Sequence, residues 1–296
     1  MTNPLVSVII ATYRRDTSLD KAIESTCNQT YSPIEIIVVD DNDEIEWNKK
    51  VRRIVEKWKG ISNVSIVLFQ NHPNQGSAKT RNKGIELSHG EYICFLDDDD
   101  LYLPNRVKNQ IENMSNDKAD YSLTDLDLYN EDETISERRK RSYLKKEGDN
   151  LLLCHLKYHM TGTDTMMFKK EYLLKIGCFE PIDVGDEFYL MMKAIIGKGK
   201  FSYLPQSDVK AYVHTVNSGL SSGKGKIKGE NELFDYKKKF FSHISKKDTR
   251  YIKMRHHAVL AFAQKRTGNL YGFFMEGVKS FFSSPVDCID LIKNLR

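Results

Sequence analysis

The sequence predicts an α/β protein with a Rossmann-like, mainly parallel central sheet, helices on both faces and a C-terminal helical extension. Short apolar runs rich in Val and Ile recur through the first hundred residues, and amphipathic helical patterns separate them. Alternation of strand and helix at this spacing is typical of βαβ units. The 296 residues are enough for one large α/β domain and a smaller appendage.

Four runs have the composition of strands, at residues 5–11, 34–39, 64–69 and 92–96. They lack polar alternation, which indicates strands buried on both faces. Two helices are predicted between the first three runs, from apolar residues at helical spacing. These residues are Leu19, Ala22, Ile23, Thr26 and Cys27, and then Trp47, Val51, Ile54, Val55 and Trp58.

The rest of the chain is less regular. Residues 131–146 are highly charged, which predicts an exposed loop or hairpin tip, and Asp186 opens a further helix. Residues 218–229 are rich in Gly, Ser and Lys, the composition of a mobile loop or linker. We therefore expect a body over 1–217, a loop over 218–229, and a basic helical extension over 230–296.

The formal net charge of +4 is unevenly distributed. Residues 216–296 carry 16 Lys and Arg against 7 Asp and Glu, a balance of +9, which leaves −5 for residues 1–215. A basic third favours an anionic partner such as a membrane surface or a phosphorylated substrate, although solvated lysines give the same balance. An amphipathic stripe is formed by Leu270, Phe273, Phe274, Gly277, Val278, Phe281 and Phe282. It suits either packing on the domain or interfacial membrane binding. Its aromatic residues do not alternate with basic ones, which disfavours nucleic acid.

The chain has the features of a cytoplasmic protein. Its five cysteines form no CxxC pair and no zinc spacing, as expected of reduced thiols. The first residues lack the charged and apolar regions of a signal peptide, and no run approaches the eighteen apolar residues of a membrane span. We expect a cytoplasmic location, peripheral on the cytoplasmic membrane face if the extension binds lipid.

Polar residues follow three of the predicted strands, at 12–15, 40–43 and 97–100. Ligands of open α/β sheets bind beside the carboxyl ends of the strands. The last segment is four consecutive aspartates, and at an effective dielectric near 20 each close pair of like charges costs a few kcal/mol. Either a divalent cation with substrate phosphates neutralises them, or they form a solvated turn before the helix near Pro104.

Several segments occur in an informative order: VSVIIATYRR, IEIIVVDDND, NQGSAKTRNKGIELSHGEYICFLDDDDLYLP, TGTDTMMFKKEYLLKIGCFEP, DEFYLMMKA and the isolated His214. Together, over residues 5–215, they resemble the family 2 glycosyltransferases of the GT-A fold found in bacterial cell-surface polysaccharide synthesis. The resemblance implies a catalytic domain over 1–217 that transfers a hexose from a nucleotide-sugar, expected to be a UDP-sugar. The acceptor would be a hydroxyl of a glycan or lipid-linked molecule, and the anomeric carbon would be inverted.

The resemblance also implies a nucleotide site. Asp41 matches the position that accepts a hydrogen bond from a pyrimidine N3–H, and helix capping is its structural alternative. Thr12, Tyr13 and Arg14 follow the first strand, where relatives hold the nucleotide, although many have Asn in place of Arg14. Arg81 would lie near the base or ribose, unless it is a surface arginine of a helix.

The four aspartates match the DxD motif of the family. Asp97 and Asp98 would face the nucleotide-sugar, and Asp99 would bind Mn²⁺ or Mg²⁺ directly. Asp100 is expected to cap the following helix. His214 matches a histidine that contacts metal or pyrophosphate in relatives, which would favour Mn²⁺, although isolated histidines are usually structural.

The catalytic base is expected at Asp186-Glu187. Relatives carry Glu-Asp here, and the second carboxylate takes the acceptor proton. Alignment on Leu190 places Glu187 at that position, so we favour Glu187 over Asp186. Both residues also suit the N-terminus of a helix. The 218–229 segment would be either a lid over the donor or an ordinary linker.

Other classes fit less well. A dehydrogenase or methyltransferase would carry a glycine-rich first turn, and residues 11–19 contain no glycine. A nucleotidyltransferase would carry a Gly-rich basic loop there. The remaining alternative is a catalytically degenerate GT-A protein that binds sugar, nucleotide or membrane, and only the reversed Asp186-Glu187 pair favours it.

Overall fold

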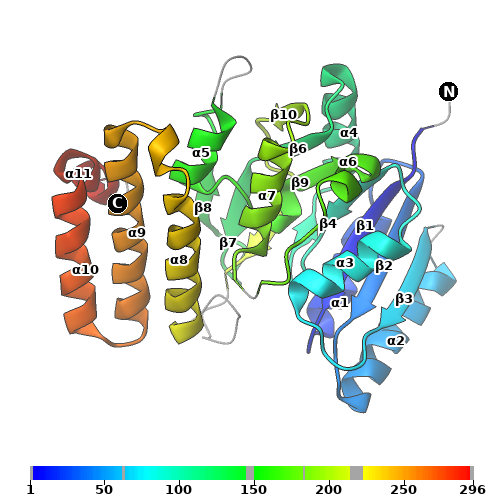
Figure 1. Ribbon diagram of the computed structural model, residues 1–296. Coiled ribbons are helices and arrows are strands. Elements are labelled where there is room, and N and C mark those ends of the chain that lie inside the picture. The colour runs from blue at the N-terminus through cyan, green and yellow to red at the C-terminus, as the bar shows by residue number, and fades with distance from the viewer. Residues whose placement is uncertain (1–2, 62–63, 145–149, 183, 214–222, 294–296) are drawn as a thin grey trace. The chain divides into compact units, whose positions relative to one another are not determined.

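The computed structural model describes residues 3–61, 64–144, 150–182, 184–213 and 223–293 (Figure 1). The chain divides into two compact units. The sheet unit comprises residues 1–149, 160–182 and 186–214, and the helical unit comprises 150–159, 183–185 and 215–296. The boundary predicted at residues 217–218 lies outside the described residues.

The sheet unit is built on seven strands in the order β10-β6-β9-β4-β1-β2-β3. Only β9 runs antiparallel to its neighbours β4 and β6, and the other pairs are parallel. The predicted mainly parallel α/β sheet is therefore confirmed. The strands are β1 Val6–Thr12, β2 Ile34–Asp40, β3 Ser65–Gln70, β4 Tyr92–Phe95, β6 Tyr121–Thr124, β9 Met166–Lys169 and β10 Phe201–Leu204.

Helices cover both faces of this sheet. Val8 and Val38 belong to the buried cluster that includes Leu19 of α1, whereas Ile9, one residue along β1, faces α3. A Cβ added to Gly84 of α3 would come within 2.4 Å of the Ile9 side chain, so a glycine permits this close helix–strand approach. The helices are α1 Thr17–Cys27, α2 Ile45–Ile61, α3 Ser77–Leu87, α4 Arg106–Asp117, α6 Lys170–Lys175 and α7 Asp186–Ile196, with the short 3₁₀ turn η1 Thr163–Thr165.

A smaller sheet has the order β5-β11-β7-β8. Its strands are β5 Leu101–Tyr102, β11 Val209–Tyr212, β7 Leu126–Tyr129 and β8 Ile135–Arg139. β7 and β8 form a hairpin, and every residue of β8 is exposed, which confirms the prediction for that part of the charged segment. Arg141 departs from it, because its guanidinium is buried and donates to the carbonyl oxygens of Thr124 and Met160.

The helical unit contains α5 Leu151–Tyr158, α8 Gly223–Lys238, the 3₁₀ turn η2 Phe241–His243, α9 Lys246–Arg266, α10 Leu270–Ser283 and α11 Pro285–Lys293. The loop predicted over 218–229 is wrong for residues 223–229, which form the first turns of α8. Lys226–Glu230 and Lys228–Glu232 pairs at i,i+4 support these turns. Gly229 also lies against Val184, where a Cβ would come within 2.6 Å.

Candidate active site

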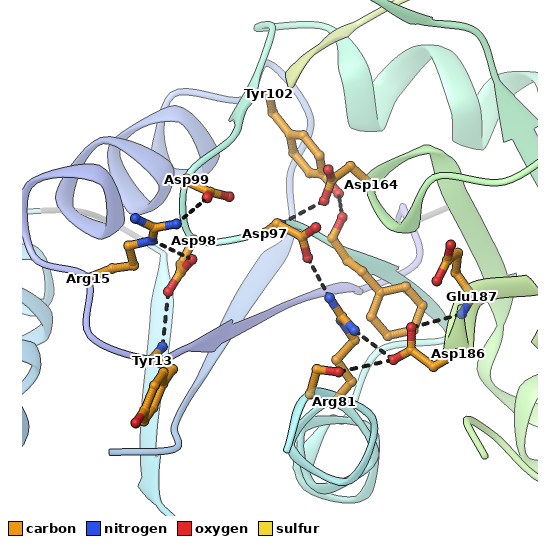
Figure 2. Close-up of polar contacts among 12 residues, drawn as sticks. Tyr13, Arg15, Arg81, Asp97, Asp98, Asp99, Tyr102, Asp164, Asp186 and Glu187 are labelled. Carbon is orange, nitrogen blue, oxygen red and sulfur yellow. Dashed lines mark hydrogen bonds and ion pairs between the residues drawn. The ribbon is translucent and has the colours of Figure 1, made fainter. Parts of the chain in front are cut away.

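The acidic segment Asp97–Asp100 connects β4 to β5 at the carboxyl end of the central sheet. It faces η1, and the backbone N–H of Asp97 donates to Asp164 Oδ1 at 2.7 Å (Figure 2). Consecutive side chains of the segment contact different partners: Asp97 pairs with Arg81, Asp99 with Arg15, and Asp100 accepts from the Tyr212 N–H. The contact partners of this one segment therefore belong to several different elements of the sheet unit.

Three carboxylates converge into what we call the acidic cluster, formed by Asp97, Asp100 and Asp164. One oxygen from each lies within 4.8 Å of the others. Asp100 and Asp164 are buried. Burial, followed by repulsion from Asp97, raises the pKa of Asp164 to about 7, and burial beside Asp164 raises the pKa of Asp100 well above its usual value. Buried carboxylates are normally paired or bound to metal, and all-oxygen donors suit Mg²⁺ or Mn²⁺.

Asp100 does not cap the helix, so that interpretation is wrong. The strand β5 and a turn separate it from α4, whose N-cap is Asn105. Asp100 instead accepts the backbone N–H of Tyr212 at 2.8 Å, which ties the acidic segment to β11.

Asp98 and Asp99 lie on the side of the segment that faces β1. Asp98 accepts the backbone N–H of Tyr13 at 3.1 Å, and burial, reinforced by the nearby Asp99, raises its pKa to about 7. Arg15 Nη2 donates to Asp99 at 2.8 Å, and Arg15 Nε lies 3.8 Å from Asp98. The structure thus places Asp99 against a guanidinium, and its assignment as a metal ligand stays a prediction.

Arg81 connects the acidic cluster to the helix that carries the expected base. Its Nη2 lies 2.7 Å from Asp97 Oδ1 and its Nη1 lies 2.9 Å from Asp186 Oδ2 (Figure 2). Only 11% of its side chain is exposed, and its guanidinium carbon lies 5.6 Å from the centre of the Phe179 ring. The alternative of a surface arginine is therefore wrong.

Asp186 begins α7 and is itself buried. Its Oδ1 accepts the N–H of Glu187 at 2.9 Å, while Oδ2 accepts from Arg81 and, at 3.4 Å, from Ser77 Oγ. Burial raises the pKa of Asp186 to about 6, against the opposing effect of Arg81. Both carboxylate oxygens of Asp186 therefore accept hydrogen bonds that hold the start of α7. Glu187 is the next residue of this helix.

The expected nucleotide residues lie at the ends of β1 and β2. Asp41 accepts the backbone N–H groups of Gln75 and Gly76 at 2.8 and 2.9 Å, so it holds the turn that enters α3. The carbonyl of Thr12 accepts the Asp41 N–H, and Tyr13 is 47% exposed.

Arg14 has left-handed backbone geometry, with φ of 54°, supported by its N–H donating to Asn42 Oδ1. Its guanidinium pairs with Glu44 and lies 5.2 Å from the centre of the Tyr13 ring. His214 lies outside the described residues.

Sequence reasoning missed three contributors. The sequence predicts a helix cap for Asp100, gives no role to Asp164 within TGTDT, and indicates Arg15 only as part of the polar segment 12–15. The available signal was weak: Asp164 precedes a strand, as many structural aspartates do. Its role depends on β9 pairing with β4, which brings η1 against the acidic segment.

Comparisons with known proteins agree with this geometry. The model of the family described as glycosyl transferase family 2 matches residues 7–177. An uncharacterized glycosyltransferase of Methanocaldococcus jannaschii is 30% identical over 240 residues, which are 80% of this chain and 78% of the relative. The UDP-Glc:alpha-D-GlcNAc-diphosphoundecaprenol beta-1,3-glucosyltransferase WfaP of Escherichia coli is 35% identical over 121 residues, 40% of this chain and 45% of that protein.

Solved structures show the same fold. TarS residues 1–349 of S. aureus, in complex with UDP-GlcNAc, superpose with a TM-score of 0.63 at 15% identity, covering 94% of this chain and 91% of TarS. The mannosyltransferase PcManGT of Pyrobaculum calidifontis, in complex with GDP-Man and Mn²⁺, gives a TM-score of 0.60 at 15% identity, covering 96% and 88%. With the family match over more than half of its length, this chain belongs to glycosyl transferase family 2 and is a glycosyltransferase of the GT-A fold.

Proposed function

We propose that the protein is a metal-dependent, inverting hexosyltransferase that uses a UDP-sugar and acts on a glycan or lipid-linked acceptor in surface polysaccharide synthesis. The observation that carries the proposal is the acidic cluster, joined through Arg81 to the start of α7. UDP-GlcNAc in the TarS complex and the UDP-Glc and diphosphoundecaprenol in the name of WfaP support the donor and acceptor classes.

The acidic cluster has the donor chemistry of a site for Mg²⁺ or Mn²⁺. Asp97, Asp100 and Asp164 would hold the cation, with Asp99 and His214 as further candidates from the family motif. Mn²⁺ in the PcManGT complex supports the ion class. When bound, the cation would offset the negative charge that develops on the leaving diphosphate.

Glu187 is proposed as the catalytic base and Asp186 as a positioning residue. Asp186 is committed to Arg81, Ser77 and the N–H of Glu187. The Glu187 carboxylate would take the proton of the acceptor hydroxyl while that oxygen attacks the anomeric carbon. The bond from this carbon to the diphosphate oxygen breaks with its electron pair, so UDP leaves from the opposite face and the configuration is inverted.

The nucleotide would lie at the carboxyl ends of β1 and β2. We propose that the exposed ring of Tyr13 and the side chains of Thr12 and Arg14 contact it, with Asp41 beside the base. Asp41 also orders the turn before α3, so its replacement would affect binding through that turn as well. Arg81 would hold Asp97 and Asp186 in place and would not contact the base or ribose, because its guanidinium already makes an ion pair with each of these carboxylates.

Calorimetric titration with UDP, GDP and dTDP, with and without Mn²⁺, tests this function. We expect UDP to bind only with Mn²⁺, and Asp100→Asn to abolish that binding. Asp132→Asn is a matched control, because Asp132 bonds only within its own exposed turn among the contacts described. A preference for GDP or dTDP would indicate that the donor is a sugar linked to that nucleotide instead of UDP. Absence of binding by a folded protein would favour the degenerate alternative.

A further inference from the structure

The helix α10 packs against α9 through small and polar residues together with the ring of Phe273. Ser280 is its one buried residue, and the Ser280 hydroxyl donates to the carbonyl of Met254 at 2.9 Å. On the same side, Glu276 lies 2.7 Å from Nδ1 of His257. A Cβ on Gly272 would come within 2.9 Å of Gln264. The side of α10 that contacts α9 is therefore largely polar, with Phe273 as its large apolar member.

Phe273 of α10 packs against α9, with its ring centre 6.4 Å from that of Phe262. Six other large apolar side chains of α10 are exposed. Their spacing of one, three and four residues places them on one helical face. Between 37% and 76% of each is exposed, and Phe282 is the most exposed. This set, the outer face, consists of Leu270, Tyr271, Phe274, Met275, Phe281 and Phe282. The next helix, α11, exposes Val286, Ile289 and Ile292 in addition. Contiguous apolar patches of this kind mark interaction surfaces.

We propose that the outer face docks on the surface of a lipid bilayer that contains anionic lipids. Among the described residues no helix is long and apolar enough to cross a membrane, so α10 would lie in the plane of the interface. Aromatic side chains such as Tyr271, Phe274 and Phe282 suit that depth.

Charge favours lipid over a second copy of the chain. Residues 216–296 carry a balance of +9, and exposed Lys265 and Arg266 end α9 directly before α10. The only charged residues within α10, Glu276 and Lys279, pair with each other at 2.6 Å. Two copies of this basic unit would repel each other, whereas an anionic bilayer attracts each of them.

This inference deepens the proposed function in one respect, because a lipid-linked acceptor is confined to a membrane. Docking would bring the enzyme to the surface in which such an acceptor diffuses. The docking itself requires neither donor nor catalysis, so vesicle binding and transfer to a water-soluble acceptor are separable measurements.

Co-sedimentation of the full chain with vesicles tests the proposal, using phosphatidylglycerol mixed with phosphatidylcholine, and phosphatidylcholine alone. We expect the triple variant L270S/F274S/F282S to bind the mixed vesicles at least about a hundredfold more weakly. The control I45S/I135S/L174S removes three exposed apolar side chains of the sheet unit and is expected to bind as the native protein does.

The charge component is tested with K265Q/R266Q. We expect about a fivefold weaker binding to mixed vesicles for each charge removed, and little change on phosphatidylcholine alone. Transfer to a soluble acceptor should be unchanged in every variant. The proposal is overturned if the native chain fails to sediment with anionic vesicles at low salt, or if the outer-face variant binds normally. It is also overturned if analytical ultracentrifugation shows a dimer that the outer-face variant dissociates.

Discussion

The acidic cluster of the sheet unit and the outer face of α10 depart in opposite directions from the usual distribution of polar and apolar groups. At the cluster, the carboxylates of Asp100 and Asp164 are buried, whereas Phe274 and Phe282 are exposed on α10. Globular proteins avoid both arrangements unless something compensates them. A small cation can compensate the first, and only an extended surface can compensate the second.

The comparison shows that the two regions should respond to different variables. Buried carboxylates are sensitive to pH and to divalent cations, because ionisation is what burial opposes. An exposed apolar face near basic residues is sensitive to lipid composition and salt. If the acidic cluster responded to lipid and the outer face to divalent cations, our interpretation of both regions would be contradicted.

The largest expected effect concerns the base beside the acidic cluster. Replacing Glu187 with Gln should lower kcat by about 10²- to 10⁴-fold, because the amide cannot take the acceptor proton. Metal-dependent UDP binding should remain, and calorimetry checks it alongside steady-state kinetics. The same loss for an outer-face variant with a soluble acceptor would break the separation between the two regions. Normal turnover of Glu187→Gln would remove Glu187 as the base.

Arg81→Gln should be the most destabilising change at the cluster. It leaves Asp97 and the buried Asp186 without their shared cation, and breaking a buried ion pair costs about 3–5 kcal/mol. Because Asp97 is partly exposed, we expect the lower end, about 3 kcal/mol, in denaturant unfolding. Arg52→Gln is the control: Arg52 makes an exposed hydrogen bond to Gln70, and its loss should cost under about 0.5 kcal/mol.

A smaller effect is expected from pH. In the folded, metal-free chain the pKa of Asp164 is raised to about 7, above its unfolded value near 3.9. The folded state then holds a proton that the unfolded state has released, so this contribution to stability is present below pH 4 and is lost as pH rises toward 7. We expect the free energy of unfolding to decline by at least about 1 kcal/mol between pH 4 and pH 7 because of Asp164.

Thermal unfolding of the native chain and of Asp164→Asn, from pH 4 to pH 8, isolates that contribution. The amide resembles the protonated acid, so the difference between the two chains should widen in favour of Asn as pH rises. Mn²⁺ should stabilise the native chain at pH 7 by mass action, and Asp164→Asn much less. A difference independent of pH would show that Asp164 is ionised in the folded protein.

Much of the sheet unit was predictable because its information is local. Runs such as 34–39 are buried on both faces, so composition alone indicates the strand. The acidic cluster was only half predictable. Adjacency in sequence drew attention to Asp97–Asp100, but the partner Asp164 lies 67 positions from Asp97 and arrives through strand pairing.

The helical unit was harder for related reasons. Glycine-rich residues 223–229 were predicted as a loop, and ion pairs with the close approach of Gly229 to Val184 override that weak local preference. For α10, the members of the predicted stripe divide between two environments. Phe273 packs against Phe262 of α9, whereas Leu270, Phe274, Phe281 and Phe282 are exposed. A stripe does not reveal which of its residues contact the neighbouring helix, and here the hydroxyl of Ser280 also faces α9.

The smallest expected effect, that of Phe274→Ser, is best measured against a substitution on the opposite side of α10. Ser280→Leu should cost about 1–3 kcal/mol, because a larger side chain must fit where the hydroxyl now lies against Met254. Phe274→Ser, six residues earlier on the outer face, should change the free energy of unfolding in solution by less than about 0.5 kcal/mol, because Phe274 is 66% exposed in the folded chain. Denaturant unfolding of both variants measures the contrast. A typical amphipathic helix would give the reverse order, so a large loss for Phe274→Ser would show that the outer face is packed in solution and would leave no surface for a bilayer.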